Sequence, residues 1–103
     1  MTERFHIDVS VAAAEQIRDA EAWWRENRPK APNAIREDLE QASLLLTMHP
    51  EVGARARNVS LTGVRRLHLA RIRYDIYYRV LATEKRIEVL GFWHRSRGTG
   101  PAI

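Results

Sequence analysis

Apolar and polar residues alternate with a period of two in three consecutive runs within residues 63–98. In the first run, Leu67 and Leu69 alternate with Arg66 and His68. The second run spans residues 72–80, and the third spans residues 86–93. The apolar members of the second run are Ile72, Tyr74, Ile76, Tyr78 and Val80. This period is typical of strands with one buried face, so we expect three strands here.

Residues 82–85 form a polar break between the second and third runs, which predicts a hairpin. Gly91 lies inside the third run, where a glycine often marks a bulge or a close approach of the backbone. The pattern leaves open whether Phe92 or Trp93 faces the core. Among the tyrosines of the second run, we expect Tyr74 and Tyr78 in the core and Tyr77 exposed.

The first half of the chain predicts a short strand over residues 5–9 and then two helices. Ser10 stands at the N-cap position of the first helix, and Asn33 stands at that of the second. Two prolines within residues 28–32 end the first helix. The apolar stripes are Ala13, Ile17, Ala20 and Trp24 in the first helix, and Ile35, Leu39, Ala42 and Leu46 in the second. The short break between the helices predicts an antiparallel helical hairpin.

The order of strand, helix, helix and three strands places the chain in the α+β class. We expect an N-terminal strand, a helical hairpin and a three-stranded antiparallel meander, which form one antiparallel sheet with the helices on one face. Residues 50–62 are expected to be a loop. With 103 residues, of which 45% are hydrophobic, residues 1–103 form a single domain with one modest core.

Charge is distributed unevenly along the chain. Residues 1–54 hold six Lys or Arg against ten Asp or Glu, whereas residues 55–103 hold eleven against three, so the balances are −4 and +8. Arginine dominates the second half, and its planar fork suits phosphate or carboxylate groups. We therefore expect an anionic partner, either nucleic acid or an acidic protein segment, although a merely solvated basic face is the alternative. The expected binding residues are Arg55, Arg57, Arg65, Arg66, His68, Arg71 and Arg95.

Known cofactor motifs are missing from the sequence. It has no glycine-rich phosphate loop, no nucleophile elbow and no histidine pair with metal-ligand spacing, so we expect neither a metal nor a cofactor. The chain has no cysteine, which fits a reducing compartment. No apolar run is long enough for a signal peptide or a membrane span. We therefore expect a cytoplasmic protein with no membrane partner.

His94 ends the third run and is followed at once by Arg95, Ser96 and Arg97. A histidine moves protons near neutral pH, and neighbouring arginines stabilise charge that grows on a phosphate. These are the parts that metal-free RNA cleavage needs. Arg73, on the neighbouring strand, is expected to share the same sheet edge. If the chain is a nuclease, its catalytic residues are Arg73, His94 and Arg97; a purely structural or binding role for this histidine is the alternative.

Several motifs, taken in their order along the chain, resemble the plasmid-stabilisation toxins of the RelE/ParE superfamily. They are GVRRL at residues 63–67, RY at 73–74, IYYRV at 76–80 and VLGFWHRSRG at 89–98. The first helix with its paired tryptophans agrees, as does the second helix ending in a turn with Pro50 and Gly53. The resemblance covers almost the whole chain.

This resemblance implies the toxin half of a type II toxin–antitoxin pair, held in a hetero-oligomer by an antitoxin that wraps it. Members of the superfamily stop bacterial growth by poisoning DNA gyrase or by cutting messenger RNA on the ribosome. The nucleases use a cluster of basic residues with a terminal Tyr or His, and this chain lacks the lysines of that cluster. We therefore favour gyrase as the target and keep a ribosome-dependent mRNA endonuclease as the alternative. A non-enzymatic RNA-binding module is a third possibility, because arginine-rich sheet faces also bind RNA.

Overall fold

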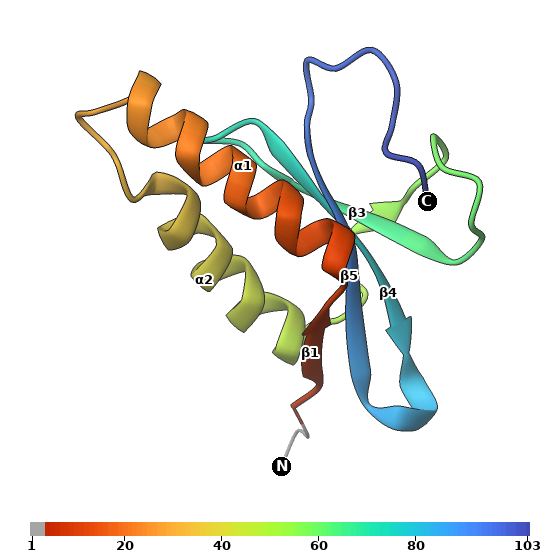
Figure 1. Cartoon of the computed structure of the whole chain (residues 1–103). Helices are drawn as coiled ribbons and strands as arrows, with labels where there is room; N and C mark the ends of the chain where they lie inside the picture. Colours follow the sequence, from red (N-terminus) through yellow and green to blue (C-terminus); the bar gives the residue numbers. More distant parts are fainter. Residues whose placement is uncertain (1–3) are drawn as a thin grey trace.

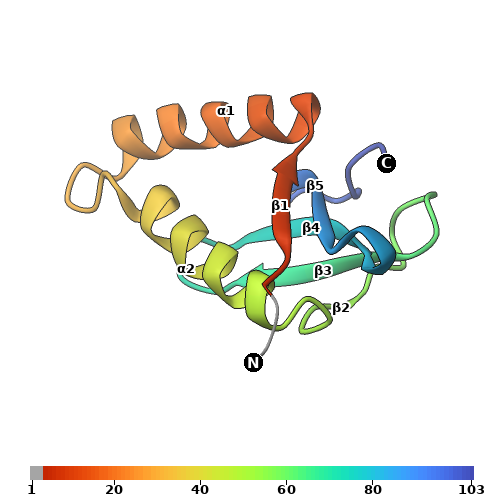
Figure 2. The ribbon, with the colours of Figure 1, turned by 90° about the horizontal axis from the view of Figure 1, so that it is seen from below.

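Two helices pack side by side on one face of a five-stranded sheet in the computed structural model, which describes residues 4–103 (Figures 1 and 2). The strands lie in the order β1-β5-β4-β3-β2. This confirms the α+β class and the helical hairpin on one face. The elements are β1 (His6–Val9), α1 (Val11–Asn27), α2 (Ala34–Met48), β2 (Ala54–Arg55), β3 (Val64–Leu69), β4 (Tyr74–Leu81), the 3-10 turn Ala82–Glu84 and β5 (Arg86–His94).

The sheet is mixed, and the expectation of a wholly antiparallel sheet was wrong. β1 pairs with β5 in parallel, with Ile7 opposite Ile87, whereas the other neighbours are antiparallel. Alternation along a strand defines its two faces but carries no information about its neighbour or direction. The predicted loop of residues 50–62 also contains β2, a two-residue strand that pairs with β3 and forms the second edge of the sheet.

Arg73 lies in the β3–β4 turn, and the prediction that it lies on a strand was wrong. β4 begins only at Tyr74, and Arg73 has a φ of 62°, in the left-handed region. Its backbone N–H donates to the carbonyl of Leu69 over 2.8 Å and closes the turn. Ile72, in the same turn, is buried in the core. Its apolar side chain therefore continues the alternating pattern of β4, although the residue is not in a strand.

The helix stripes and one face of the sheet form the core, as predicted. Ser10 caps α1 through a 3.1 Å hydrogen bond from the Ala13 amide to Oγ, whereas Asn33 makes no such side-chain bond at α2. In β5, Phe92 is the aromatic residue that faces the core. The helices therefore cover what we call the helix face of the sheet, and the opposite face is called the outer face.

Gly91 marks a β-bulge, as its position suggested. Tyr77 lies opposite Gly91 while Tyr78 lies opposite Val89, so Leu90 is an extra residue in β5. The side-chain carbonyl of Gln16 on α1 accepts the Phe92 N–H just after the bulge, at 2.7 Å.

Tyr77 is only 1% exposed, and the prediction that it faces solvent was wrong. It lies on the outer face, where Asn58 donates to its hydroxyl over 2.9 Å. The C-terminal segment also folds back over this region: the amides of Ser60 and Leu61 both donate to the carbonyl of Ile103. Contacts between segments so distant in the chain cannot be predicted from the local alternation of apolar and polar residues.

The packing of α2 gives a direct test of the core assignment. Leu46 is 1% exposed and Leu44, two positions away on the same helix, is 52% exposed. Leu46→Ala should lower the free energy of unfolding by about 2 to 5 kcal/mol, because it leaves a cavity in the core. The matched control Leu44→Ala should change it by less than about 0.5 kcal/mol. Chemical denaturation of both variants checks this, and equal losses would contradict the assigned face.

Candidate functional site

A groove of about 840 Å³ lies between α1 and the end of the sheet formed by the β3–β4 turn and the last residues of β5. We call it the α1 groove. Tyr74 and Phe92 line it as a stacked pair with ring centroids 4.5 Å apart. Trp23 and Trp24 line it from the helix. Its arginines are Arg28, Arg71, Arg73 and Arg97, and His94 also lines it.

The three residues proposed from sequence as a catalytic set meet in this groove. Tyr74, the first residue of β4, lies opposite His94, the last residue of β5. The Arg95 amide then donates to the Arg73 carbonyl over 2.8 Å, which ties the segment after β5 to the turn before β4. Arg73, His94 and Arg97 therefore lie together, as expected, but at one end of the interior strands β4 and β5 rather than at an edge of the sheet. Their role in function stays a prediction.

The surroundings of His94 lower the pKa of its imidazole below the ordinary value of 6.5. Burial is the largest cause, and the positive charges of Arg73 and Arg97 add to it, against a smaller opposing effect of Asp75. The ring also meets the ring of Tyr74 edge-on, with centroids 4.9 Å apart. His94 is consequently neutral at pH 7.

Hydrogen bonds determine which nitrogen of the neutral ring carries the proton. The backbone N–H of Ser96 donates to Nδ1 over 3.1 Å, and the Ser96 hydroxyl lies 2.6 Å from the same nitrogen. Because a backbone amide can only donate, Nδ1 is the acceptor and the proton is on Nε2. The one lone pair of the neutral ring already accepts a hydrogen bond, so neutral His94 offers a hydrogen-bond donor at Nε2.

A smaller hollow of about 320 Å³ lies on the outer face, and we call it the outer hollow. Asp75, only 3% exposed, is a buried carboxylate in its lining. One oxygen of Asp75 lies 2.8 Å from Nδ1 of His68 and 3.2 Å from Nη2 of Arg95. Sequence reasoning missed Asp75; the available signal was a single acidic residue within an otherwise basic run. The other side chains that line this hollow include Arg66, Tyr77, Trp93, His94 and Arg97.

Four of the seven residues expected to bind a partner have strong contacts within the chain. His68 and Arg95 bond to Asp75. Arg71 bonds to Glu37 and Asp38 of α2, at 3.0 and 2.7 Å. The fourth, Arg65, donates to the carbonyl of Gly53 over 2.7 Å. Within residues 4–103, the remaining three have no carboxylate partner: Arg55, Arg57 and Arg66.

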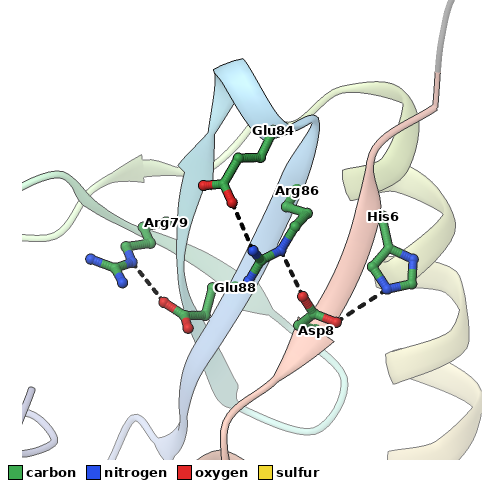
Figure 3. Close-up of polar contacts among 6 residues, drawn as sticks. All are labelled: His6, Asp8, Arg79, Glu84, Arg86 and Glu88. Atoms are coloured by element: carbon green, nitrogen blue, oxygen red, sulfur yellow. Dashed lines mark hydrogen bonds and ion pairs between the residues drawn. The ribbon is translucent and has the colours of Figure 1, made fainter.

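Ion pairs neutralise the opposite end of the sheet, at the β4–β5 hairpin (Figure 3). Arg86 bonds to both Asp8 of β1 and Glu84 of the hairpin, at 2.8 and 2.9 Å. Arg79 bonds to Glu88 across the two strands at 2.7 Å. Two arginines of the α1 groove, at the other end of the sheet, differ from these. Arg73 and Arg97 have no carboxylate partner in the described part of the chain.

The described part of the chain holds neither a cluster of metal ligands nor a membrane-spanning helix. No group of three or more His, Cys, Asp or Glu side chains within residues 4–103 is placed to hold a metal ion. None of the helices in that same range is long and apolar enough to cross a bilayer.

Comparison with known proteins identifies the family. The profile of a family described as the ParE toxin of the type II toxin–antitoxin system parDE matches residues 7–98. The chain belongs to the ParE toxin family. It is thus the toxin component of a type II toxin–antitoxin system and a member of the RelE/ParE superfamily. Among curated proteins, none matches the sequence significantly.

Solved toxin–antitoxin structures share the fold of this ParE family member. A chain of the chromosomal ParDE system from P. aeruginosa is 22% identical, with a TM-score of 0.69 over 88% of this chain and 96% of that one. A chain of the RelBE2 complex from Mycobacterium tuberculosis is 18% identical, with a TM-score of 0.66 over 93% and 97%. A chain of the intact E. coli RelBE complex is 16% identical, with a TM-score of 0.65 over 90% and 99%. At these identities the likeness shows the fold alone.

The electrostatics of the site predict a titration that can be measured. In an NMR titration, the His94 imidazole should have a pKa below 6.5, and Arg73→Ala should raise it, because one of the two nearby positive charges is removed. Arg55→Ala is the matched control, since Arg55 lies on β2 at the far edge of the sheet, and it should leave the titration unchanged. A His94 pKa that does not respond to Arg73→Ala would contradict the described geometry.

Proposed function

We propose that this ParE family member arrests bacterial growth by binding and inhibiting DNA gyrase in the cytoplasm. We further propose that a protein antitoxin neutralises it within a hetero-oligomer. Membership of the ParE family supports the gyrase target. The shared fold with chains of ParDE and RelBE toxin–antitoxin complexes supports the antitoxin partner.

The observation that favours binding over catalysis is the hydrogen bond from the Ser96 amide to Nδ1 of His94, at 3.1 Å. A nuclease of this type needs a base that removes the proton of a ribose 2′-hydroxyl. In the neutral imidazole only one nitrogen can accept that proton, and in His94 this nitrogen is already an acceptor. Arg73 and Arg97, which lack carboxylate partners within residues 4–103, then act as contacts to the target.

A messenger RNA endonuclease is the second candidate, and one observation favours it. His94 lines the α1 groove together with Arg73 and Arg97, and its Nε2 makes no hydrogen bond within residues 4–103. In its protonated form, the imidazolium of His94 can give the Nε2 proton to the leaving 5′-oxygen and return to the neutral ring, while Arg73 and Arg97 stabilise the phosphate. Such a nuclease must take its general base from a residue other than His94.

Growth arrest in variants of His94 and Arg97 separates the two candidates. Gln at position 94 keeps a hydrogen-bond donor but cannot transfer protons, so His94→Gln should still arrest growth if the chain acts by binding. Arg97→Glu should abolish arrest by reversing a contact charge. Induced cells should show DNA damage and intact messenger RNA. Arg18→Glu, at an exposed position of α1 outside the groove, is the charge-matched control and should stay toxic.

The nuclease candidate makes the opposite prediction for the same strains. His94→Gln should then lower messenger RNA cleavage on the order of a hundred-fold or more, and arrest should be lost with it. Thermal unfolding of each purified variant shows whether a loss of toxicity reflects a loss of folded protein. Cleaved messenger RNA in wild-type cells, absent in His94→Gln cells, would overturn the gyrase proposal.

A further inference from the structure

The sheet edge at β2, opposite the edge formed by β1, carries a cluster of arginines. Residues 52–74 hold six arginines and no Asp or Glu, so this segment cannot neutralise its own charge. Two of the six, Arg71 and Arg73, lie at the β3–β4 turn. The other four lie in or next to the β2–β3 pair, and we call them the edge arginines: Arg55, Arg57, Arg65 and Arg66. Within residues 4–103, none of these four has a carboxylate partner.

The register of the β2–β3 pair places two of these charges against each other. Arg55 lies directly opposite Arg65, and Ala54 lies opposite Arg66. Like charges at directly opposite positions of an antiparallel pair lower its stability. Because successive side chains of a strand point to opposite faces, Arg65 and Arg66 bring positive charge to both faces of this edge. The repulsion between Arg55 and Arg65 opposes folding, and an anion bound between them removes it.

Arg65 is already held in a position to bind an anion. Its Nη1 donates to the carbonyl oxygens of Gly53 and Glu51, at 2.7 and 3.2 Å. Both acceptors are uncharged, so they hold the guanidinium without cancelling its charge. The Gly53 amide is fixed in turn, because it donates to the hydroxyl of Tyr78 over 2.9 Å. Nε and Nη2 of Arg65 make no hydrogen bond within residues 4–103, so they are free to bind a phosphate through two parallel hydrogen bonds.

We propose that the edge arginines bind the phosphate backbone of duplex DNA. The aromatic rings beside them in the sheet are buried. Tyr78, opposite Arg65, is 0% exposed, and Tyr77, opposite Arg66, is 1% exposed. Single-stranded nucleic acid is bound by stacking its bases on exposed aromatic rings, and these two tyrosines offer no such platform.

Contacts to phosphates alone suit a duplex, which keeps its bases stacked inside and presents a dense row of charge. It carries one negative charge per about 1.7 Å of its axis, so a short stretch of backbone reaches several of the edge arginines at once. On the function proposed above, this duplex is the DNA that gyrase holds. The chain then contacts gyrase through Arg73 and Arg97 and the DNA through the edge at β2.

Fluorescence anisotropy of a dye-tagged twenty-base-pair DNA duplex, with purified chain and no gyrase, tests the proposal. The logarithm of the association constant should fall with the logarithm of the salt concentration with a slope of about −3 to −4, because about four phosphates are neutralised. Arg55→Glu and Arg57→Glu, both at exposed positions, should each weaken binding about tenfold or more, since each replaces a phosphate contact by repulsion. Arg18→Glu on α1 makes the same change of net charge and should bind nearly as the wild type does.

Thermal unfolding separates a lost contact from a lost fold. Arg55→Glu should unfold at the same temperature as the wild type or higher, because the substitution places opposite charges across the β2–β3 pair. A weaker complex formed by this variant then reports on the contact itself.

Three outcomes overturn the proposal. The first is a loss of binding no greater in Arg55→Glu than in Arg18→Glu, which would leave the edge as a solvated basic face. The second is a twenty-residue oligothymidine or an RNA duplex of equal length that binds more tightly than the DNA duplex. The third is an oligoglutamate peptide that displaces the duplex at lower concentration than unlabelled duplex does, which would assign the edge to an acidic protein.

Failure of this proposal is separable from failure of the proposed function. If the duplex does not bind while the chain still inhibits supercoiling by gyrase, the DNA site is wrong and the gyrase target stands. If the duplex binds through the edge arginines while supercoiling is unaffected, the DNA site stands and the gyrase target is wrong.

Discussion

The bulge at Leu90 and Gly91 decides which side chains reach each face of the sheet. Before the bulge, Ile87 and Val89 face the core; after it, Phe92 does so and His94 lies on the same face of β5, because the extra residue shifts the alternation by one. Without the shift, Trp93 would take the place of Phe92, since a slip of one residue exchanges the faces of a strand. Gln16 completes the arrangement by accepting the amide of Phe92. The position of His94 in the α1 groove therefore depends on this bulge.

Gly91 suits the bulge for a steric reason as well. A Cβ atom there would lie 3.1 Å from Cδ1 of Ile103 and 3.6 Å from the side-chain oxygen of Gln16. The glycine thus lets the C-terminal segment pack across β5 on one side of the bulge. That segment, through Thr99, accepts the indole N–H of Trp93 at 2.6 Å, and Trp93 in turn carries the guanidinium of Arg97. The bulge positions His94 at the end of β5, and the C-terminal segment, through Trp93, positions Arg97.

The charge of the second half is smaller in effect than its balance of +8 suggests. Arg79 and Arg86 are neutralised at the hairpin, Arg71 by α2, and Arg95 by the buried Asp75. These pairs hold the β3–β4 turn and the sheet edges in place, so much of the basic character of the sequence serves the fold. The cations that stay available mark the α1 groove and the edge at β2 and β3.

Local patterns in the sequence predicted the elements, and distant contacts determined the rest. The helix stripes, the three long strands, the bulge at Gly91 and the meeting of Arg73 with His94 all follow from residue spacing. The burial of Tyr77 depends on Asn58 and on the C-terminal segment, and the parallel pairing of β1 depends on a partner some eighty residues away. The turn at Arg73 could not be predicted from the sequence, because Ile72 fits the apolar alternation of β4 although it is buried from a turn and not from a strand. The sequence could not predict that Ser96 places the His94 proton on Nε2, because this depends on a single hydrogen bond in the folded chain.

Stoichiometry tests the central claim most directly, because a binding toxin is consumed by its target whereas a nuclease turns over. Purified chain should be titrated into a DNA supercoiling assay with a fixed amount of gyrase, and in parallel into translating ribosomes with a defined messenger RNA. The account predicts that supercoiling stops once the chain is about equimolar with gyrase, while the messenger RNA stays intact. Unaffected supercoiling, together with messenger RNA cut by far less chain than ribosome, would contradict it.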